Sequence, residues 1–152
     1  MYHLSSYTFL LGKYCIYRKD KRCPEGLTPG NVFWNDDDDS LHNGDEQSGA
    51  HPDFEIFHDA YTLIYFCCKT DGDKNNSVLL PSKSPFFLLA YNSSTCQMVK
   101  WTVVSLEWIY FSTYSSDNQD SADGAFPYDA GNKQVTIYYC YYQGKKIRFI
   151  QQ

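Results

Sequence analysis

A chain of 152 residues and 17.6 kDa is long enough for one well-buried domain and too short for two of ordinary size. Thirteen basic and eighteen acidic residues give a net charge of −5. This charge excludes a basic nucleic-acid-binding protein, because nothing supplies a positive field for phosphates. No apolar run approaches the roughly 18 residues needed to span a membrane. Apolar residues at 43% and aromatic residues at 18% predict a folded, β-rich domain.

Short apolar and aromatic runs, separated by turn residues, predict strands along the chain. In chain order the expected strands cover residues 13–17, 32–34, 61–67, 77–80, 85–91, 97–104, 108–111 and 134–140. Turns are expected at residues 24–26 and 28–30, where Pro and Gly cluster. No amphipathic helical pattern of any length is present. Short strands at this spacing are typical of an all-β, compact antiparallel β-sandwich or barrel-like domain.

Two stretches of the chain repeat the same order of features. In each, a strand leads into a polar loop, then a Gly-Ala-aromatic-Pro motif, and then a strand that ends in cysteine. The motifs are Gly49-Ala50-His51-Pro52 before Cys67 and Gly124-Ala125-Phe126-Pro127 before Cys140. We therefore expect an internal duplication of half-units that share one core, since each is too small to be stable alone. The expected boundaries are a lead-in at 1–13, a domain at 14–142 with half-units at about 14–72 and 80–142, and a tail or edge strand at 143–152.

Six cysteines without a CxxC pair favour disulfides over a zinc site. Six cysteines allow 15 connectivities, and the duplication selects one of them. Because Cys67 and Cys140 occupy equivalent places, the expected bonds are Cys23–Cys67 and Cys96–Cys140, which leaves Cys15–Cys68. Cys67 and Cys68 are neighbours on a strand, so their side chains point to opposite faces and can serve different partners.

Disulfides and sequons together predict a secreted protein. Disulfides persist in oxidising compartments, and the sequons beginning at Asn75 and Asn92 are candidate N-glycosylation sites. The first eleven residues do not form a convincing signal peptide, because the charge at Lys13 comes too late and polar residues interrupt the apolar run. We expect the chain to be a mature form or a fragment of a longer precursor.

The acidic residues are concentrated in one segment. No Lys or Arg lies between Arg22 and Lys69, and that stretch holds ten acids, whereas the rest of the chain has a net charge of +5. The run Asp36, Asp37, Asp38 and Asp39 offers the oxygen ligands that Ca²⁺ needs, although its spacing does not fit an EF-hand. The alternative is a solvated acidic loop. His42, His51 and His58 lie in the same segment, but their spacing matches no standard zinc site.

An ordered set of motifs resembles the ApeC domain, the C-terminal domain of apextrin-like proteins. The matching stretches are residues 13–19, 23–26, 33–38, 65–72, 80–81, 85–89, 96–99, 107–108 and 138–142. The resemblance covers residues from about Tyr14 to Tyr142. It implies a secreted innate-immune recognition module that binds bacterial cell-wall material such as peptidoglycan and its muramyl fragments. An adhesive or extracellular-matrix role is also associated with the family.

Glycan binding needs flat aromatic faces for sugar rings, beside amides and carboxylates for hydroxyl groups. Side chains of these types that could supply such a site are Trp34, Asn35, Asp36, Asn43, Tyr114 and Tyr128. For Trp34 the alternative is a place in the core. Muramyl peptides also carry carboxylates, so Arg18 and Lys19, with Lys21 and Arg22, are candidate contacts. The alternative for this cluster is an ordinary solvated turn.

Catalytic motifs are absent from the sequence. No G-x-S-x-G motif is present, and most acids lie in polar loops where a raised pKa is not expected. We therefore expect a binding protein and not an enzyme, although cell-wall hydrolysis by a pair of acids stays an alternative. The other alternative is a structural or adhesive extracellular protein, in which the acidic loop bridges cations during self-association or binding to extracellular proteins.

Overall fold

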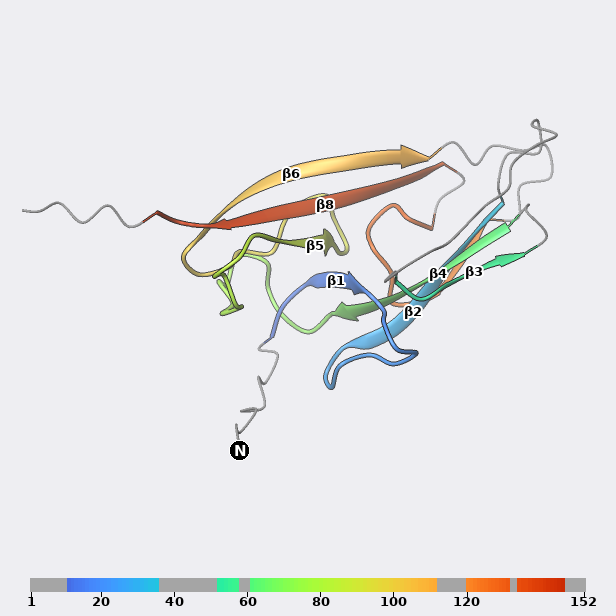
Figure 1. Cartoon of the computed structure of the whole chain (residues 1–152), viewed down its shortest axis with the longest axis horizontal. Helices are drawn as coiled ribbons and strands as arrows, with labels where there is room; N and C mark the ends of the chain where they lie inside the picture. The colour runs from blue at the N-terminus through green and yellow to red at the C-terminus, as the bar shows by residue number, and fades with distance from the viewer. Residues whose placement is uncertain (1–10, 36–51, 58–60, 112–119, 132–133, 147–152) are drawn as a thin grey trace, which may run out of the picture.

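The computed structural model describes residues 11–35, 52–57, 61–111, 120–131 and 134–146 (Figure 1). The described residues form strands and connecting turns and no helix. The strands are β1 (Tyr14–Tyr17), β2 (Thr28–Asn35), β3 (Phe54–Phe57), β4 (Tyr61–Lys69), β5 (Phe86–Ala90), β6 (Thr102–Phe111), β7 (Ser121–Gly124) and β8 (Val135–Gly144). Their pairing is antiparallel throughout, so the predicted all-β antiparallel class is confirmed.

All eight strands belong to one sheet with the order β6-β8-β5-β1-β4-β2-β7, and β3 pairs with β4. In Figure 1, β6, β8 and β5 lie along one side of the molecule and β4, β3 and β2 along the other, with β1 between them. The sheet curls strongly. The curl brings Trp34 of β2 against Phe111 of β6, and the centroids of the two stacked rings are 5.3 Å apart. Four strands separate β2 from β6 in the sheet order. No hydrogen-bonded pairing closes the sheet between these two strands in the described part of the chain.

Each face of the sheet carries its own apolar cluster, because side chains alternate between the faces along every strand. The cluster on the inner side of the curl contains Val32, Phe66, Leu89 and Ile137 among its members. On the opposite face, Leu88, Cys140 and Tyr142 pack with Val78 and Val99. The second cluster therefore fixes the β4–β5 connection, through Val78, and the β5–β6 connection, through Val99, against the sheet.

Three disulfides join strands and loops of the sheet, and they are the three pairs expected from the duplication. They are Cys15–Cys68, Cys23–Cys67 and Cys96–Cys140. Cys15 and Cys68 are directly opposite each other on β1 and β4. Cys67, on the other face of β4, reaches Cys23 in the loop before β2. The described residues contain no free cysteine.

The strand pairings of the first half of the sheet correspond to those of the second half. On one side β1 pairs with β4 through Ile16 and Cys67, and on the other β5 pairs with β8 through Leu88 and Cys140. The outer neighbours are β2 on β4 and β6 on β8, and β1 and β5 meet in the middle. This arrangement supports two related half-units near 14–72 and 80–142, which stay a proposal.

Three of the predicted local elements differ from the structure in whole or in part. The expected turn at 28–30 lies inside β2, where Pro29 and Gly30 are opposite Cys67 and Phe66. Gly30 is needed there because a Cβ would overlap the backbone of Ala125. The expected strand at 77–80 and the first half of the one at 97–104 contribute only one parallel bridge, between Val78 and Val99, whereas residues 102–104 belong to β6.

The continuous strand in this region is β6, and it begins only at Thr102. Trp101, directly before it, has a φ of 59°, which interrupts extended backbone. At the C-terminus the described part of the predicted tail extends β8 to Gly144. The expected lead-in falls largely on residues 1–10, outside the described residues, and the end of the tail at 147–152 does so as well.

Candidate functional site: the basic turn after β1

A tight turn follows β1 and presents a cluster of basic side chains. Lys19 and Arg22 form an antiparallel bridge across it. The two residues between them, Asp20 and Lys21, have φ values of 58° and 61°. Two successive positive φ values define a type I′ turn, which normally uses Gly or Asn because other residues are strained there. Strained backbone of this kind persists only where the surroundings hold it in place.

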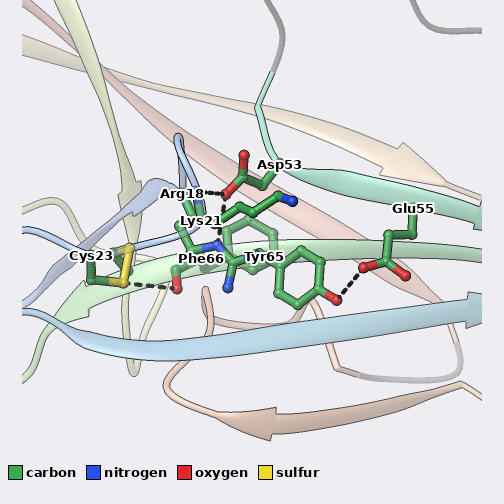
Figure 2. Close-up of polar contacts among 8 residues, drawn as sticks. Arg18, Lys21, Cys23, Asp53, Glu55, Tyr65 and Phe66 are labelled. Atoms are coloured by element: carbon green, nitrogen blue, oxygen red, sulfur yellow. Dashed lines mark hydrogen bonds and ion pairs between the residues drawn. A yellow bond between two sulfur atoms is a disulfide. The ribbon is translucent and has the colours of Figure 1, made fainter.

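Asp53 supplies that support from a distant part of the sequence (Figure 2). Its Oδ2 accepts hydrogen bonds from Arg18 Nε at 2.8 Å and from the backbone N–H of Lys21 at 2.7 Å. Its own backbone N–H donates to the carbonyl of Arg18 at 2.8 Å. One residue next to β3 therefore fixes both the start and the tip of the turn.

Arg18 makes one further side-chain contact, so its role differs from that of its basic neighbours. Its guanidinium lies 3.8 Å above the ring centroid of Tyr65, a cation–π contact (Figure 2). The Tyr65 hydroxyl in turn donates to Glu55 at 2.8 Å. Asp53, Arg18, Tyr65 and Glu55 thus form one connected network. Within it, Arg18 positions the turn and is half-buried, whereas Lys19 is exposed.

The electrostatics of the network favour an ionised Asp53. Desolvation tends to raise the pKa of this carboxyl, but the hydrogen bonds from Arg18 and from the Lys21 and Asp20 amides outweigh it and lower the pKa. The pKa of Tyr65 is raised, by desolvation first and then by its hydrogen bond to the Glu55 carboxylate. At neutral pH the network is therefore an ion pair beside a neutral phenol.

Three further cations on the turn are exposed to solvent. The side chains of Lys19, Lys21 and Arg22 are exposed, and no salt bridge links them to another described residue. Lys19 and Arg22 line a hollow of about 290 Å³ with Asp20 and Arg18. Its remaining wall is mainly apolar and consists of Ile16, Tyr17, Pro24 and the Cys23–Cys67 disulfide. The hollow can accommodate an anionic group beside an apolar one.

Two other predicted glycan contacts, Trp34 and Tyr128, do not line this hollow. Trp34 is 5% exposed, donates from Nε1 to the Ala130 carbonyl at 3.1 Å and stacks on Phe111. The expectation that Trp34 presents its ring to a sugar is corrected accordingly, because the core occupies both the ring and its N–H. Tyr128 is exposed and packs on Tyr138 of β8. Asn35 ends β2, and its side chain is outside what the structure describes.

Several predicted site residues lie outside the described residues. They are Asp36, Asp37, Asp38, Asp39, Asn43 and Tyr114, together with His42, His51 and His58. The calcium hypothesis for the acidic run therefore stays a prediction. Within the described ranges, no group of three or more His, Cys, Asp or Glu side chains is arranged to hold a metal ion.

The two sequon asparagines lie at one hollow. Asn75 and Asn92 are both exposed and border a polar hollow of about 600 Å³, together with Lys13 and Lys74. Lys74 Nζ donates to Ser93 Oγ and to the carbonyls of Ser93 and Thr95. Desolvation, followed by repulsion from Lys13, lowers the pKa of Lys74. The Lys74 ammonium is thus already hydrogen-bonded by the loop. Asn75 and Asn92 are exposed at the border of the same hollow.

Sequence reasoning found the basic cluster but missed the residues that support it. Asp53 and Glu55 were counted only as part of the acidic segment, and Tyr65 only as part of a strand. Asp53 follows Arg18 by 35 residues, and no local pattern connects two residues at that distance. The unusual turn sequence Asp20-Lys21, where Asn-Gly would be preferred, is not a signal either until its φ angles are known.

Comparison with protein-family models shows which family this chain belongs to. A family model described as ApeC, the C-terminal domain of apextrin, matches residues 3–142. The chain belongs to the ApeC family. The matched region contains all six cysteines and the basic turn, so the site described above is part of the ApeC domain itself. No curated protein and no solved structure matches the chain.

The described residues contain no helix that is long and apolar enough to cross a membrane.

Proposed function

We propose that this ApeC domain is a secreted innate-immune recognition module that binds bacterial cell-wall glycan, specifically peptidoglycan and its muramyl peptides, through the turn after β1. The observation that carries the proposal is the set of three exposed cations, Lys19, Lys21 and Arg22, on a turn held by Asp53. Membership of the ApeC family supports an apextrin-like extracellular protein.

The chemistry of the turn suits the carboxylates of muramyl peptides. Lys and Arg donate charge-assisted hydrogen bonds to carboxylates, and Arg can do so in a bidentate manner. The apolar wall around the Cys23–Cys67 disulfide offers a surface for lactyl or alanyl methyl groups. Because Asp53 holds the turn before the ligand arrives, little ordering is needed on binding, and the affinity gains from this preorganisation.

Secretion belongs to the same proposal. Three disulfides in one small domain fit an oxidising compartment. Asn75 and Asn92 are exposed, as N-glycosylation requires, and we propose both as acceptors. Binding without catalysis stays our prediction; the hydrogen bonds to Asp53 in the network lower the pKa of its carboxyl.

Retention on insoluble peptidoglycan tests the proposal. The variant carries Lys19→Gln, Lys21→Gln and Arg22→Gln, which removes three charges and keeps the side chains polar. The matched control carries Lys83→Gln, Lys100→Gln and Lys145→Gln, which removes the same charge from exposed positions outside the turn. Each protein is incubated with peptidoglycan in the presence and in the absence of EDTA, and the bound fraction is measured over a concentration series.

We expect saturable retention of the wild type and of the control, and loss of most retention in the turn variant. Equal retention of both variants would contradict binding through the turn. Retention that disappears with EDTA would favour a cation-dependent site in the acidic run at Asp36–Asp39. Release of soluble fragments over time would favour the hydrolase alternative.

The adhesive alternative has one observation in its favour. A row of large apolar side chains is exposed along β6, at the edge of the sheet, and includes Leu106, Trp108 and Ile109. Exposed apolar patches of this kind mark interaction surfaces. Self-association along this edge is compatible with the recognition function.

A further inference from the structure

The first strand of the sheet order, β6, has an open edge. It pairs with β8 over ten residues and with no other described strand. Both of its faces are exposed as well, with large apolar side chains between 45% and 64% exposed: Val103, Val104, Leu106, Trp108, Ile109 and Tyr110. Soluble proteins usually protect such edges with charges, prolines, bulges or covering segments. The only charged residue of β6 is Glu107.

The corresponding strand on the other side of the sheet is covered. β2 flanks β4 as β6 flanks β8. The outer edge of β2 pairs with β7, from Gly30 opposite Gly124 to Phe33 opposite Ser121. β6, which is longer and more apolar on its exposed faces, has no such partner among the described strands. Its edge therefore offers unpaired backbone groups beside an apolar surface, which is the arrangement that recruits another strand.

We propose that the edge of β6 pairs with β6 of a second copy of this chain, in an antiparallel twofold dimer. In an antiparallel pair the backbone groups of alternate residues face the partner, so a twofold axis must pass between one residue and its own copy. If the axis passed at Glu107, two carboxylates would be directly opposite each other, which is destabilising. If it passed at Ser105, Glu107 would be opposite Val103.

With the axis at Leu106, the strand is complementary to itself. Leu106 is then opposite its own copy, and Glu107 is opposite Ser105 of the second copy. This polar pairing is compatible with the existing contact, because Ser105 Oγ already donates to Glu107 Oε1 at 3.0 Å within one chain. Two further positions pair apolar side chains, with Trp108 opposite Val104 and Ile109 opposite Val103, and Tyr110 is opposite Thr102. The register therefore places the one charge of β6 against a hydroxyl.

The exposed apolar surface along β6 supplies a large part of the area that a stable dimer needs. Fully burying an aromatic side chain removes roughly 150–250 Å² from water. Trp108 and Tyr110 of β6 and the adjacent Trp101 are 64%, 45% and 67% exposed. Together with the aliphatic side chains of β6, the surface reaches several hundred Å². Specific interfaces bury about 800 Å² on each partner.

Introducing a charge of either sign at Leu106, the residue on the axis, tests the proposal on the full chain. Leu106→Lys places two ammonium groups opposite each other in the dimer, and Leu106→Glu places two carboxylates there. A mixture of the two variants places Lys opposite Glu. The matched control is Leu79→Lys, a leucine of similar exposure, 50% against 46%, away from β6. Sedimentation velocity over a concentration series gives the oligomeric state, and circular dichroism verifies the fold of each variant.

We expect wild type and Leu79→Lys to form dimers, each Leu106 variant alone to be monomeric, and the equimolar mixture to form dimers again. Restoration by mixing cannot result from misfolding, so it separates the proposal from a loss of structure. A monomeric wild type at every concentration would overturn the proposal and assign the edge to another partner. A mixture that stays monomeric would overturn the twofold register at Leu106.

Discussion

The carboxylate of Asp53 lies 2.8 Å from Nε of Arg18, although 35 residues separate the two in the chain. The same oxygen accepts the N–H of Lys21 at 2.7 Å. One ion pair thus fixes a turn in which two successive residues have positive φ angles. The exposed cations of the turn are presented by this contact, and the proposed function depends on it.

The contribution of Asp53 to stability depends on pH. Its pKa in the folded protein lies below the ordinary value of 3.8, so the stabilisation is complete above that value and is lost as pH falls through the folded pKa. We expect Asp53→Asn to lower the melting temperature at pH 7, and the gap to wild type to narrow as pH falls below about 4. Thermal unfolding at several pH values measures the gap. Asp123→Asn, at an exposed position of β7, serves as the control; a gap of constant size across the pH range would refute the assignment.

The strain at Lys21 predicts a substitution that stabilises the protein. A side chain in the left-handed region costs about 1–2 kcal/mol, whereas Gly pays about 0.5–1 kcal/mol in chain entropy. Lys21→Gly keeps the N–H that Asp53 accepts, so we expect a gain of about 0.5–1 kcal/mol. This gain corresponds to a rise of roughly 1–4 °C in Tm. Lys19→Gly, where φ is not positive, should lower Tm. A lower Tm for Lys21→Gly would show that the turn is not strained.

Two disulfides should contribute unequally to stability, although Cys23–Cys67 and Cys96–Cys140 both join residues separated by 44 positions. Cys23 and Cys67 lie inside the loop that Cys15–Cys68 already closes, so the additional loop that Cys23–Cys67 closes has only about 10 residues. In the chain-entropy model Cys23–Cys67 therefore contributes about 3 kcal/mol and Cys96–Cys140 about 4 kcal/mol. We expect the paired Cys→Ser variant of Cys96–Cys140 to lose the larger free energy of unfolding in urea. A larger loss for the Cys23–Cys67 variant would mean that native contacts, and not loop entropy, determine the effect.

Gln97 is a buried polar side chain that hydrogen-bonds to the backbone of two different segments. It is 1% exposed, accepts the Lys13 N–H at 2.8 Å and donates to the Asn76 carbonyl at 2.8 Å. Gln97→Leu leaves these backbone groups without partners, so we expect a loss of about 2–4 kcal/mol in the free energy of unfolding. Urea denaturation measures it, with Gln143→Leu on the exposed end of β8 as control, where a change within about 0.5 kcal/mol is expected. Similar losses in both variants would speak against the Gln97 network.

The sequence predicted what depends on spacing and composition. The equivalent places of Cys67 and Cys140 led to the three cysteine pairs, and alternation on a strand explained why Cys67 and Cys68 serve different partners. The start of β6 could not be predicted, because the apolar run from Gln97 continues through Trp101, whose positive φ ends the extended backbone. Gly30 and Pro29 looked like a turn, since their place in β2 depends on the close approach of Ala125.

The candidate site was predictable only in its exposed half. The basic residues from Arg18 to Arg22 are contiguous, so composition alone points to them. Their division into one positioning residue, Arg18, and three exposed cations depends on Asp53 and Tyr65, which tertiary structure brings to the turn. Trp34 was ambiguous for the same reason, because the curl of the sheet places Phe111 and Ala130 against it.

A titration of the ¹⁵N-labelled protein with muramyl dipeptide, followed by NMR, tests the central claim most directly. We predict saturable shifts of the backbone amides of Arg18, Lys19, Asp20, Lys21, Arg22 and Cys23, unchanged by EDTA and absent from the variant with all three turn cations replaced by Gln. The absence of shifts at the turn, or saturable shifts confined to the hollow beside Asn75 and Asn92, would contradict the account.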